Sequence, residues 1–399
     1  MTRVLYVNQT AQVSGAERSL LAMVDGVRPA VEPVLACPPG ELTDAARELG
    51  VRTTPIAGTL ASFRLHPVHT TRGLFEIGRS ALQVRAAVAR LRPDLVHANT
   101  TRASLLAVLA RHRDRPPIVA HIRDWAPDGR LPRLVDGVIG RRADAVVANS
   151  TTVGDQFRDV RLRRPVRVIH NAVDLDRFDP AASDGAAVRT ELRIPAERIV
   201  LSVIGQLAPI KGQDDAIEIL AGLLEAGCDA ELLLVGTAKF TAPGASLDNE
   251  EFERRLHSVA AERGVLERVR FLGERGDVPD VLAASDLMLM PFWREGFGRV
   301  AIEAMALGVP VAAAAVGGPL DIVRPGVDGL LLPPREPVAW VPELLPLLGD
   351  RGRRIEMGAH GRERAREFSL QSQINAVMGL YGELVAGDPI PTTRSIFRR

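Results

Sequence analysis

The sequence predicts an α/β protein built from two domains, each containing a sheet of parallel strands. The chain has 399 residues, enough for two or three domains of about 150 residues each. Short, unbroken apolar segments alternate with longer helical patterns, and this alternation occurs twice along the chain. A polar stretch with several Pro and Asp residues, at 172–198, shows no strand pattern and separates the two series. We therefore expect one domain at 1–172 and a second at 173–365.

The predicted strands are β-branched or Leu-rich segments without polar alternation, which indicates burial on both faces of a parallel sheet. In chain order they are 3–7, 33–37, 94–97, 118–121, 145–148 and 166–169, then 199–204, 231–235, 268–272, 286–290, 309–313 and 329–332. Helical patterns between the strands include 17–26, 101–111, 214–226 and 300–308. After the second domain we predict a helix at 366–387 and a flexible tail at 388–399.

The composition argues against several functional classes. The net charge of +1 gives no global attraction to nucleic acids or acidic membranes, and the low aromatic content of 4% argues against a surface for single-stranded nucleic acid. Only Cys37 and Cys228 are present, too few for a disulfide framework or a cysteine-based metal site. The first residues, MTRVLYVNQT, resemble a strand rather than a secretory signal, and no apolar segment reaches the roughly 18–20 residues of a membrane-spanning helix. We expect a cytoplasmic protein.

The segment 287–323 carries the densest chemical pattern of the chain. A buried strand ends at Pro291, and a glycine-containing loop then leads into a helix that we expect to begin near Arg299 or Val300. Gly296 and Gly298 allow the loop backbone to approach a ligand closely. The first amides of the helix have no partners within the helix and favour an anion such as a diphosphate.

Two carboxylates flank this predicted anion site: Glu295 in the loop and Glu303 about one turn into the helix. Carboxylates repel phosphates but accept hydrogen bonds from hydroxyls, so we expect this pair to bind hydroxyl groups of a sugar or a ribose. The phosphates then require a cation. Lys211, one of only two lysines in the chain, lies in the loop 205–213 after a predicted strand. Parallel strands present such loops at one edge of the sheet, where open α/β sheets bind their ligands.

The sequence EGFGRVAIEAMALGVPV at 295–311 resembles the donor site of the family 4 retaining glycosyltransferases, which have the GT-B fold. The segment 205–212 is similar to the glycine- and lysine-containing element of that family, and SGAERSL, VIHNAVDLDRF and VGGPLDIV resemble further family landmarks in the same order. The resemblance implies two Rossmann-like domains that face each other across a deep cleft. The N-terminal domain would bind the acceptor, the C-terminal domain the donor, and the C-terminal helix would cross back to the N-terminal domain.

The resemblance also implies roles for individual residues. Catalysis would involve Lys211, Glu295 and His121, with Lys211 on the diphosphate, Glu295 near the sugar hydroxyls and Glu303 on the ribose. Gln206 stands where the family has an arginine, so it can donate a hydrogen bond but adds no charge; Arg299 or Arg294 would compensate. The full set implied to bind the donor is Gly15, Gln206, Lys211, Glu295, Gly296, Phe297, Gly298, Arg299 and Glu303. Arg123 and Asp124 follow His121 and are candidate contacts to donor or acceptor.

Some patterns permit other interpretations. GFGRVA at 296–301 fits a dinucleotide-binding fingerprint, but it begins five residues after Pro291 instead of at a strand end, which disfavours an NAD-dependent oxidoreductase. The DLD string at 174–176 suggests turn and helix-capping aspartates more than a metal site. The basic segment 72–92 is either a helix packed on the sheet or a helix in weak contact with a membrane surface.

The sequence therefore predicts a retaining glycosyltransferase that moves a sugar from a nucleoside-diphosphate sugar to a hydroxyl acceptor or an amine-bearing sugar. The acceptor would be a sugar, a lipid-linked sugar or a small molecule, in polysaccharide, glycolipid or natural-product biosynthesis. We expect no metal and no other cofactor. The alternatives are another GT-B enzyme acting on nucleotide sugars, such as an epimerase, or a non-catalytic protein that binds them.

Overall fold

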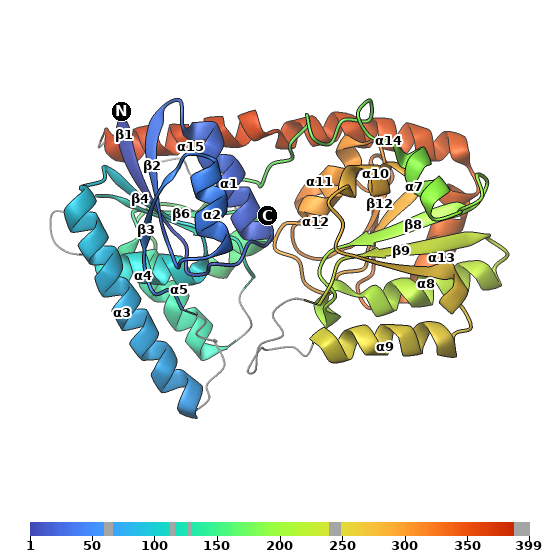
Figure 1. Cartoon of the computed structure of the whole chain (residues 1–399), viewed down its shortest axis with the longest axis horizontal. Helices are drawn as coiled ribbons and strands as arrows, with labels where there is room; N and C mark the ends of the chain where they lie inside the picture. The colour runs from blue at the N-terminus through green and yellow to red at the C-terminus, as the bar shows by residue number, and fades with distance from the viewer. Residues whose placement is uncertain (60–66, 112–115, 126–128, 239–248, 387–399) are drawn as a thin grey trace. The chain divides into compact units, whose positions relative to one another are not determined.

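The computed structural model describes residues 1–59, 67–111, 116–125, 129–238 and 249–386, and the chain divides into two compact units. The first unit comprises Met1–Asn171 together with Leu370–Arg399, and the second comprises Ala172–Ser369. Each unit is a sheet with helices on both of its faces (Figure 1). The predicted α/β fold with two parallel sheets is confirmed. The tail predicted at 388–399 lies outside the described residues.

The sheet of the first unit, within the described residues, has seven strands in the order β3-β2-β1-β4-β5-β6-β7, and neighbouring strands are parallel. Strand order reverses at β1, which pairs with β2 on one side and β4 on the other, so the switch point lies between β1 and β4. The strands are β1 (Thr2–Val7), β2 (Val31–Cys37), β3 (Arg52–Pro55), β4 (Leu95–Ala98), β5 (Ile118–Ile122), β6 (Ala145–Ala148) and β7 (Arg167–Val168).

Helices cover both faces of this sheet because successive strand residues point to opposite sides. Val4 and Tyr6 of β1 pack against α1, α2 and α15, whereas Leu5 and Val7 face the core formed with α3, α4, α5 and α6. These helices are α1 (Gly15–Val27), α2 (Glu41–Glu48), α3 (Pro67–Leu91), α4 (Thr101–Ala110), α5 (Arg130–Arg142), α6 (Thr151–Gly154) and α15 (Leu370–Val385). The last helix of the chain thus belongs to the core of the first unit.

The described part of the second unit has a six-stranded parallel sheet in the order β10-β9-β8-β11-β12-β13. β8 pairs with β11 through Leu201 and Leu287, so the loops that follow these two strands leave the sheet at the same edge. The strands are β8 (Ile199–Ile204), β9 (Ala230–Val235), β10 (Val269–Gly273), β11 (Leu287–Met290), β12 (Val311–Ala314) and β13 (Gly329–Leu332). The helices are α7 (Gly185–Glu191), α8 (Gln213–Glu225), α9 (Asn249–Glu262), α10 (Val278–Ala283), α11 (Arg299–Ala306), α12 (Pro319–Ile322), α13 (Pro337–Leu348) and α14 (Arg351–Ala365).

The differences from the predicted elements have local causes. β3 was not predicted because RTTP is largely polar, and it forms an edge strand that pairs only with β2. The strand predicted at 166–169 is reduced to two residues in β7, at the opposite edge. At the C-terminus, Ser369 has an extended backbone, and the final helix begins at Leu370 instead of at 366. None of the helices in the described ranges is long and apolar enough to cross a bilayer.

Candidate active site

In the second unit, the two loops after β8 and β11 are in direct backbone contact. Gly212 precedes α8 in the left-handed conformation, with φ of +57°, and a Cβ atom there would lie 2.1 Å from the carbonyl oxygen of Pro291. The amide of Trp293 donates a hydrogen bond of 2.9 Å to the carbonyl of Ile210. This contact places Lys211, which directly precedes Gly212, beside the loop that carries Glu295.

Lys211 and Glu295 form an ion pair, with Nζ 2.5 Å from Oε2. Both side chains are largely buried, at 19% and 15% exposed. The ammonium also lies 4.3 Å from the centre of the Phe292 ring, in a favourable cation–π position. The second oxygen of Glu295 accepts a hydrogen bond of 3.2 Å from the amide of Phe297. The carboxylate therefore links the lysine of one loop to the backbone of the other.

Glu303 and Arg299 form a second ion pair, one turn apart on α11, at 2.9 Å. Glu303 is buried, and α11 begins at Arg299 as the sequence predicts. Gly298 precedes the helix with a φ of +96° and offers no capping side chain, so the first amides of α11 depend on other partners. The ring of Phe297 packs in the core, 6.0 Å from that of Phe368, so only its backbone is available to a ligand.

Two further glycines shape this loop and were not predicted as site residues. A Cβ atom at Gly317, which has a φ of +72°, would lie 1.9 Å from the carbonyl oxygen of Glu295. A Cβ at Gly318 would lie 2.2 Å from Cα of Phe297. The amide of Gly318 donates to the carbonyl of Glu295 at 3.2 Å. The sequence signal was the Gly317–Gly318 pair in VGGPLDIV. The physical reason for the pair is that this segment packs backbone to backbone against the loop of Glu295, where a side chain would not fit.

Gln206 occupies the start of the loop after β8. Its backbone carbonyl accepts a hydrogen bond of 2.9 Å from Nε2 of Gln213, the first residue of α8. The backbone of the preceding residue, Gly205, is in close contact with Gly236. A Cβ atom at Gly236 would lie 2.0 Å from the Gly205 carbonyl oxygen. In the set implied to bind the donor, the cations are Lys211 and Arg299, and each is paired with a carboxylate.

In the first unit, His121 lies near the carboxyl end of β5 and on the same sheet face as His97 of β4 and Tyr6 of β1. Nε2 of His97 is 3.1 Å from Nδ1 of His121, and Nδ1 of His97 is 2.7 Å from the hydroxyl of Tyr381 on α15. Burial, with a contribution from the charge of Arg123, lowers the pKa of His97 to about 3. The same two causes, together with His97, lower the pKa of His121 well below its usual value. Both imidazoles are neutral at pH 7.

Arg123 follows β5 and is almost completely buried. Its guanidinium donates hydrogen bonds of 2.7 Å to Oδ1 of Asn99 and 2.9 Å to Oγ of Ser19, and it also donates to Oδ1 of Asn171. Nδ2 of Asn99 in turn donates a hydrogen bond of 3.1 Å to Oδ1 of Asn8. Asn8 and Asn99 follow β1 and β4, the two strands at the switch point, and neither was predicted as a site residue.

The remaining predicted residues of this unit, Asp124 and Gly15, have different surroundings. Asp124 is exposed, and its backbone carbonyl accepts a hydrogen bond of 3.2 Å from Gln156. Gly15 is exposed at the start of α1, and a Cβ atom there would have no neighbour within 4 Å. Packing in the described structure therefore does not require a glycine at this position.

The predicted site residues thus form two groups, one in each unit. The group in the first unit is Gly15, His121, Arg123 and Asp124, and the group in the second is Gln206, Lys211, Glu295, Gly296, Phe297, Gly298, Arg299 and Glu303. Among the residues that the structure describes, no group of three or more His, Cys, Asp or Glu side chains is arranged to hold a metal ion. Asp174 of the DLD string instead accepts hydrogen bonds from the amides of Asp176 and Arg177, which is the turn geometry predicted for it.

Two parallel α/β sheets, with a lysine and two glutamates at the carboxyl edge of the second, define the class of GT-B glycosyltransferases. The model of the family "Glycosyl transferases group 1" matches residues 186–364, and the model "Glycosyltransferase Family 4" matches residues 13–177. Together the two matches span most of both units, and the match to "Glycosyl transferases group 1" contains Lys211, Glu295 and Glu303.

Named relatives and solved structures agree with this class. The chain is 33% identical to the D-inositol 3-phosphate glycosyltransferase of Salinispora tropica over 329 residues, which cover 76% of this chain and 67% of that protein. The enzyme of the same name from Salinispora arenicola is also 33% identical, with 76% and 72% covered. The structure of HepE from Anabaena in complex with UDP-glucose matches with a TM-score of 0.81 and 24% identity, over 96% of this chain and 100% of that one. The chain belongs to glycosyltransferase family 4.

The glycine at 317 provides a test of the loop contact. We expect Gly317→Ala to displace the Glu295 loop, because the added methyl group would overlap with the Glu295 carbonyl, and to weaken binding of a nucleoside diphosphate at least tenfold, or about 1.4 kcal/mol. Gly326→Ala is the matched control, because Gly326 has a similar φ of +76° but no atom within 4 Å of its Cβ position. Isothermal titration calorimetry with UDP measures both; an equal loss in the two variants would show that backbone strain alone is responsible.

Proposed function

We propose that this enzyme transfers a sugar from a nucleoside-diphosphate sugar to an acceptor hydroxyl with retention of configuration at the anomeric carbon. The observation that carries the proposal is the Lys211–Glu295 pair at the edge of the second sheet, beside the start of α11. Cleavage of the bond to the diphosphate places negative charge on the leaving phosphate. An ammonium and a set of helix N-terminal amides are suited to stabilise that charge.

The two glutamates take a complementary role on the uncharged parts of the donor. Each carboxylate can accept hydrogen bonds from hydroxyls while its cation turns toward a phosphate. Glu295 would bind the sugar and Glu303 the ribose, as the family resemblance implies. Arg299, paired with Glu303 at the start of α11, would compensate for the uncharged Gln206, and its position at the helix N-terminus supports this choice over Arg294.

The similar proteins indicate which donor and which acceptor to test first. HepE, which shares the fold, was crystallised with UDP-glucose, so UDP-sugars are the first donors to examine. The relatives at 33% identity are named for D-inositol 3-phosphate, so a phosphorylated cyclitol is the first acceptor. A cytoplasmic location is also part of the proposal, because Cys37 and Cys228 are both free thiols, as is usual in a reducing compartment.

Lys211→Ala tests the central role. We expect turnover to fall by about 10²–10³, or about 3–4 kcal/mol of barrier, because one preorganised charge partner of the leaving group is lost. The measurement is release of UDP from a UDP-sugar in the presence of D-inositol 3-phosphate and of other hydroxyl acceptors. Arg263→Ala is the control: it removes a more exposed cation paired with Glu218 and Glu225 in the same unit, and its turnover should match the unsubstituted enzyme. Unchanged turnover in Lys211→Ala, with the same melting temperature, would refute the leaving-group role.

The proposal includes catalysis without a metal ion. Lys211 and Arg299 supply the positive charge that a divalent cation provides in other enzymes acting on diphosphates. We therefore expect the transfer rate to be unchanged, within about a factor of two, after dialysis against EDTA. A loss of activity that Mg²⁺ or Mn²⁺ restores would contradict this part of the proposal.

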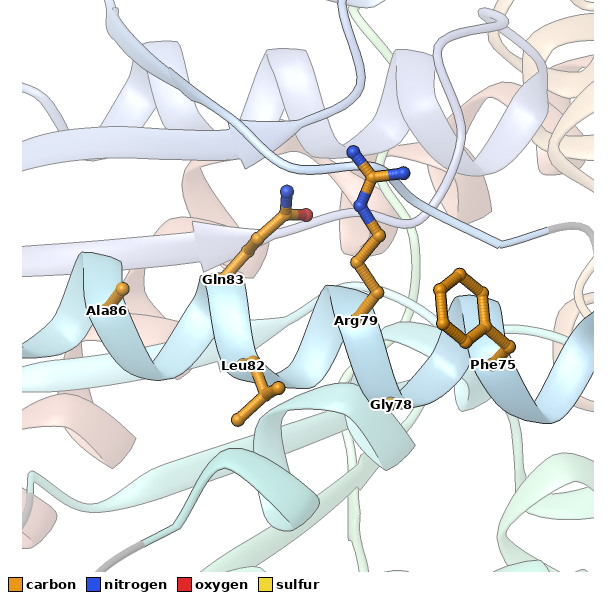
Figure 2. Close-up of a pocket in the computed structure, with 6 residues that line it drawn as sticks. All are labelled: Phe75, Gly78, Arg79, Leu82, Gln83 and Ala86. Atoms are coloured by element: carbon orange, nitrogen blue, oxygen red, sulfur yellow. The ribbon is translucent and has the colours of Figure 1, made fainter.

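We also propose that α3 makes a weak contact with an anionic lipid surface. Val84 and Val88 are buried and pack toward the sheet, so the helix has one face in the core and one face outward. On the outer side, Phe75 and Leu82 are 71% and 66% exposed. Figure 2 shows both on the same helix as Arg79, where they line a shallow hollow.

The sign of the charge favours anionic lipid as the partner. The exposed residues of α3 include the cations Arg79, Arg85 and Arg90. The carboxylate of Glu76, next to Phe75, is half-buried and accepts a hydrogen bond from the hydroxyl of Thr59. Each arginine near an anionic bilayer contributes about 1 kcal/mol, and apolar side chains add to this by entering the interface.

The test is co-sedimentation with vesicles of phosphatidylcholine, with and without phosphatidylglycerol. We expect binding only to the anionic vesicles, and a loss of about tenfold or more when Phe75→Ser and Leu82→Ser are combined. Complete burial of each side chain contributes roughly 1.5–3 kcal/mol, so even partial burial of the two contributes about 1.4 kcal/mol. Leu134→Ser on α5 is the matched control, since Leu134 is 61% exposed in the same unit. Equal sedimentation of the double variant and the control would rule out α3 as the contact.

A further inference from the structure

The loop that carries Glu295 is joined to the start of α8 by a side chain as well as by its backbone. The indole Nε1–H of Trp293, two residues before Glu295, donates a hydrogen bond of 2.5 Å to Oδ2 of Asp215. Asp215 lies in the first turn of α8, four residues after Lys211, and both bonded residues are half-buried. Within the second unit, this bond therefore connects the same two segments as the Lys211–Glu295 ion pair.

The indole ring of Trp293 has a second partner in Arg335. The central carbon of the guanidinium lies 4.4 Å from the centre of the ring, in a cation–π position. Arg335 is exposed in the connection between β13 and α13, and its φ of +62° is in the left-handed region that favours glycine. A glycine would satisfy this turn, so the contact with the indole is what the arginine side chain adds.

The charges around Asp215 favour the bond. Burial raises the pKa of the Asp215 carboxyl, and the negative charges of Asp214 and Glu218 act in the same direction. The hydrogen bond from Trp293 and the positive charge of Arg335 act in the opposite direction, because both favour the ionised form. Trp293 and Arg335 thus stabilise a carboxylate in a half-buried position at the start of α8.

The two side-chain links between these segments respond differently to a bound diphosphate. In the proposed function, Lys211 turns from Glu295 to the phosphates, so the ion pair is given up on binding. An indole has one donor and no acceptor, and the donor of Trp293 is already bonded to Asp215. A carboxylate repels a phosphate, so the ligand offers neither partner a better contact. The Trp293–Asp215 bond therefore remains when the ion pair is exchanged.

We propose that Trp293 and Asp215 are positioning residues, which hold the Glu295 loop against α8 while Lys211 exchanges Glu295 for a diphosphate. The proposal rests on the function proposed above, because it needs a ligand that draws Lys211 away from its carboxylate. Without the bond, the loop has lost one link in the free protein and a second on binding. Part of the binding free energy is then used to order the loop, and the affinity for the diphosphate falls.

The bond is measured directly by NMR of the indole N–H groups. The chain has three tryptophans, so the full-length protein labelled with ¹⁵N-tryptophan gives three indole signals, and Trp293→Phe assigns the one of interest. Exchange of this N–H with solvent is compared in the unsubstituted protein and in Asp215→Ala, without and with saturating UDP. We expect slow exchange in the unsubstituted protein under both conditions, and exchange at least about tenfold faster in Asp215→Ala.

Affinity for UDP, measured by isothermal titration calorimetry, tests the positioning role. Trp293→Phe removes the N–H and keeps a ring for Arg335, and Asp215→Ala removes the acceptor. We expect each to weaken UDP binding about tenfold, as for one hydrogen bond to a charged group. The double variant should bind no more weakly than either single one, because both remove the same bond.

Two further variants separate this role from a general effect on α8. Asp215→Asn retains an acceptor oxygen and should restore most of the affinity for UDP. Glu218→Gln is the matched control, because it removes a half-buried carboxylate that is paired with Arg263 on the same helix, and it should bind UDP as the unsubstituted protein does. Melting temperatures of all variants are recorded, so that unfolding is not mistaken for a loss of affinity.

Several outcomes would overturn the positioning role. They are rapid exchange of the Trp293 N–H once UDP is bound, unchanged exchange in Asp215→Ala, additive losses of affinity in the double variant, and affinities of the single variants equal to that of Glu218→Gln. The proposed function fails separately: if the unsubstituted protein binds UDP and shows the expected exchange and affinities but transfers no sugar, the positioning role stands and the transferase activity is rejected.

Discussion

The backbone contact between the loops after β8 and β11 is the constraint on which the candidate donor site depends. The two strands are parallel neighbours, so their loops leave the sheet together, and Gly212 and Gly317 bring backbone against backbone on either side of the glutamate loop. No side chain fits at either point. Lys211 and Glu295 meet because their neighbours in sequence are held in this way. α8 and α11 begin next to these loops, which adds two sets of helix N-terminal amides to the same edge of the sheet.

The two units provide different kinds of chemistry. In the second unit the functional groups are charged, and Lys211 and Arg299 are each matched to a carboxylate that can turn to a hydroxyl when a phosphate approaches. In the first unit His97 and His121 are neutral at pH 7, because burial and the charge of Arg123 lower the pKa of both imidazoles. The polar groups of the two units therefore differ in kind: those of the second unit are joined by ion pairs, and those of the first by a buried series of hydrogen bonds.

Much of the second site could be predicted because its residues are close in sequence. Glu295, Glu303 and the glycines between them lie in one strand–loop–helix segment, and local patterns alone indicate where the helix begins. β3 was missed because a short polar edge strand has no apolar pattern to distinguish it from a loop. Gly317 and Gly318 lie in VGGPLDIV, which resembles a family landmark. Glycine is needed there because the segment contacts the carbonyl of Glu295 and the backbone of Phe297, about 20 residues away in sequence.

The sequence by itself determined the α/β class, the order of the strands along the chain and the identity of the charged groups, because each depends on local periodicity or on residue type. Only the tertiary structure decided which of these groups act together. It paired Lys211 with Glu295 across 84 positions and brought Tyr381 to His97 across 284. The physical reason is that ion pairs and hydrogen bonds depend on distances of about 3 Å between atoms. Such distances between remote positions follow from strand pairing and helix packing, and no local pattern encodes them.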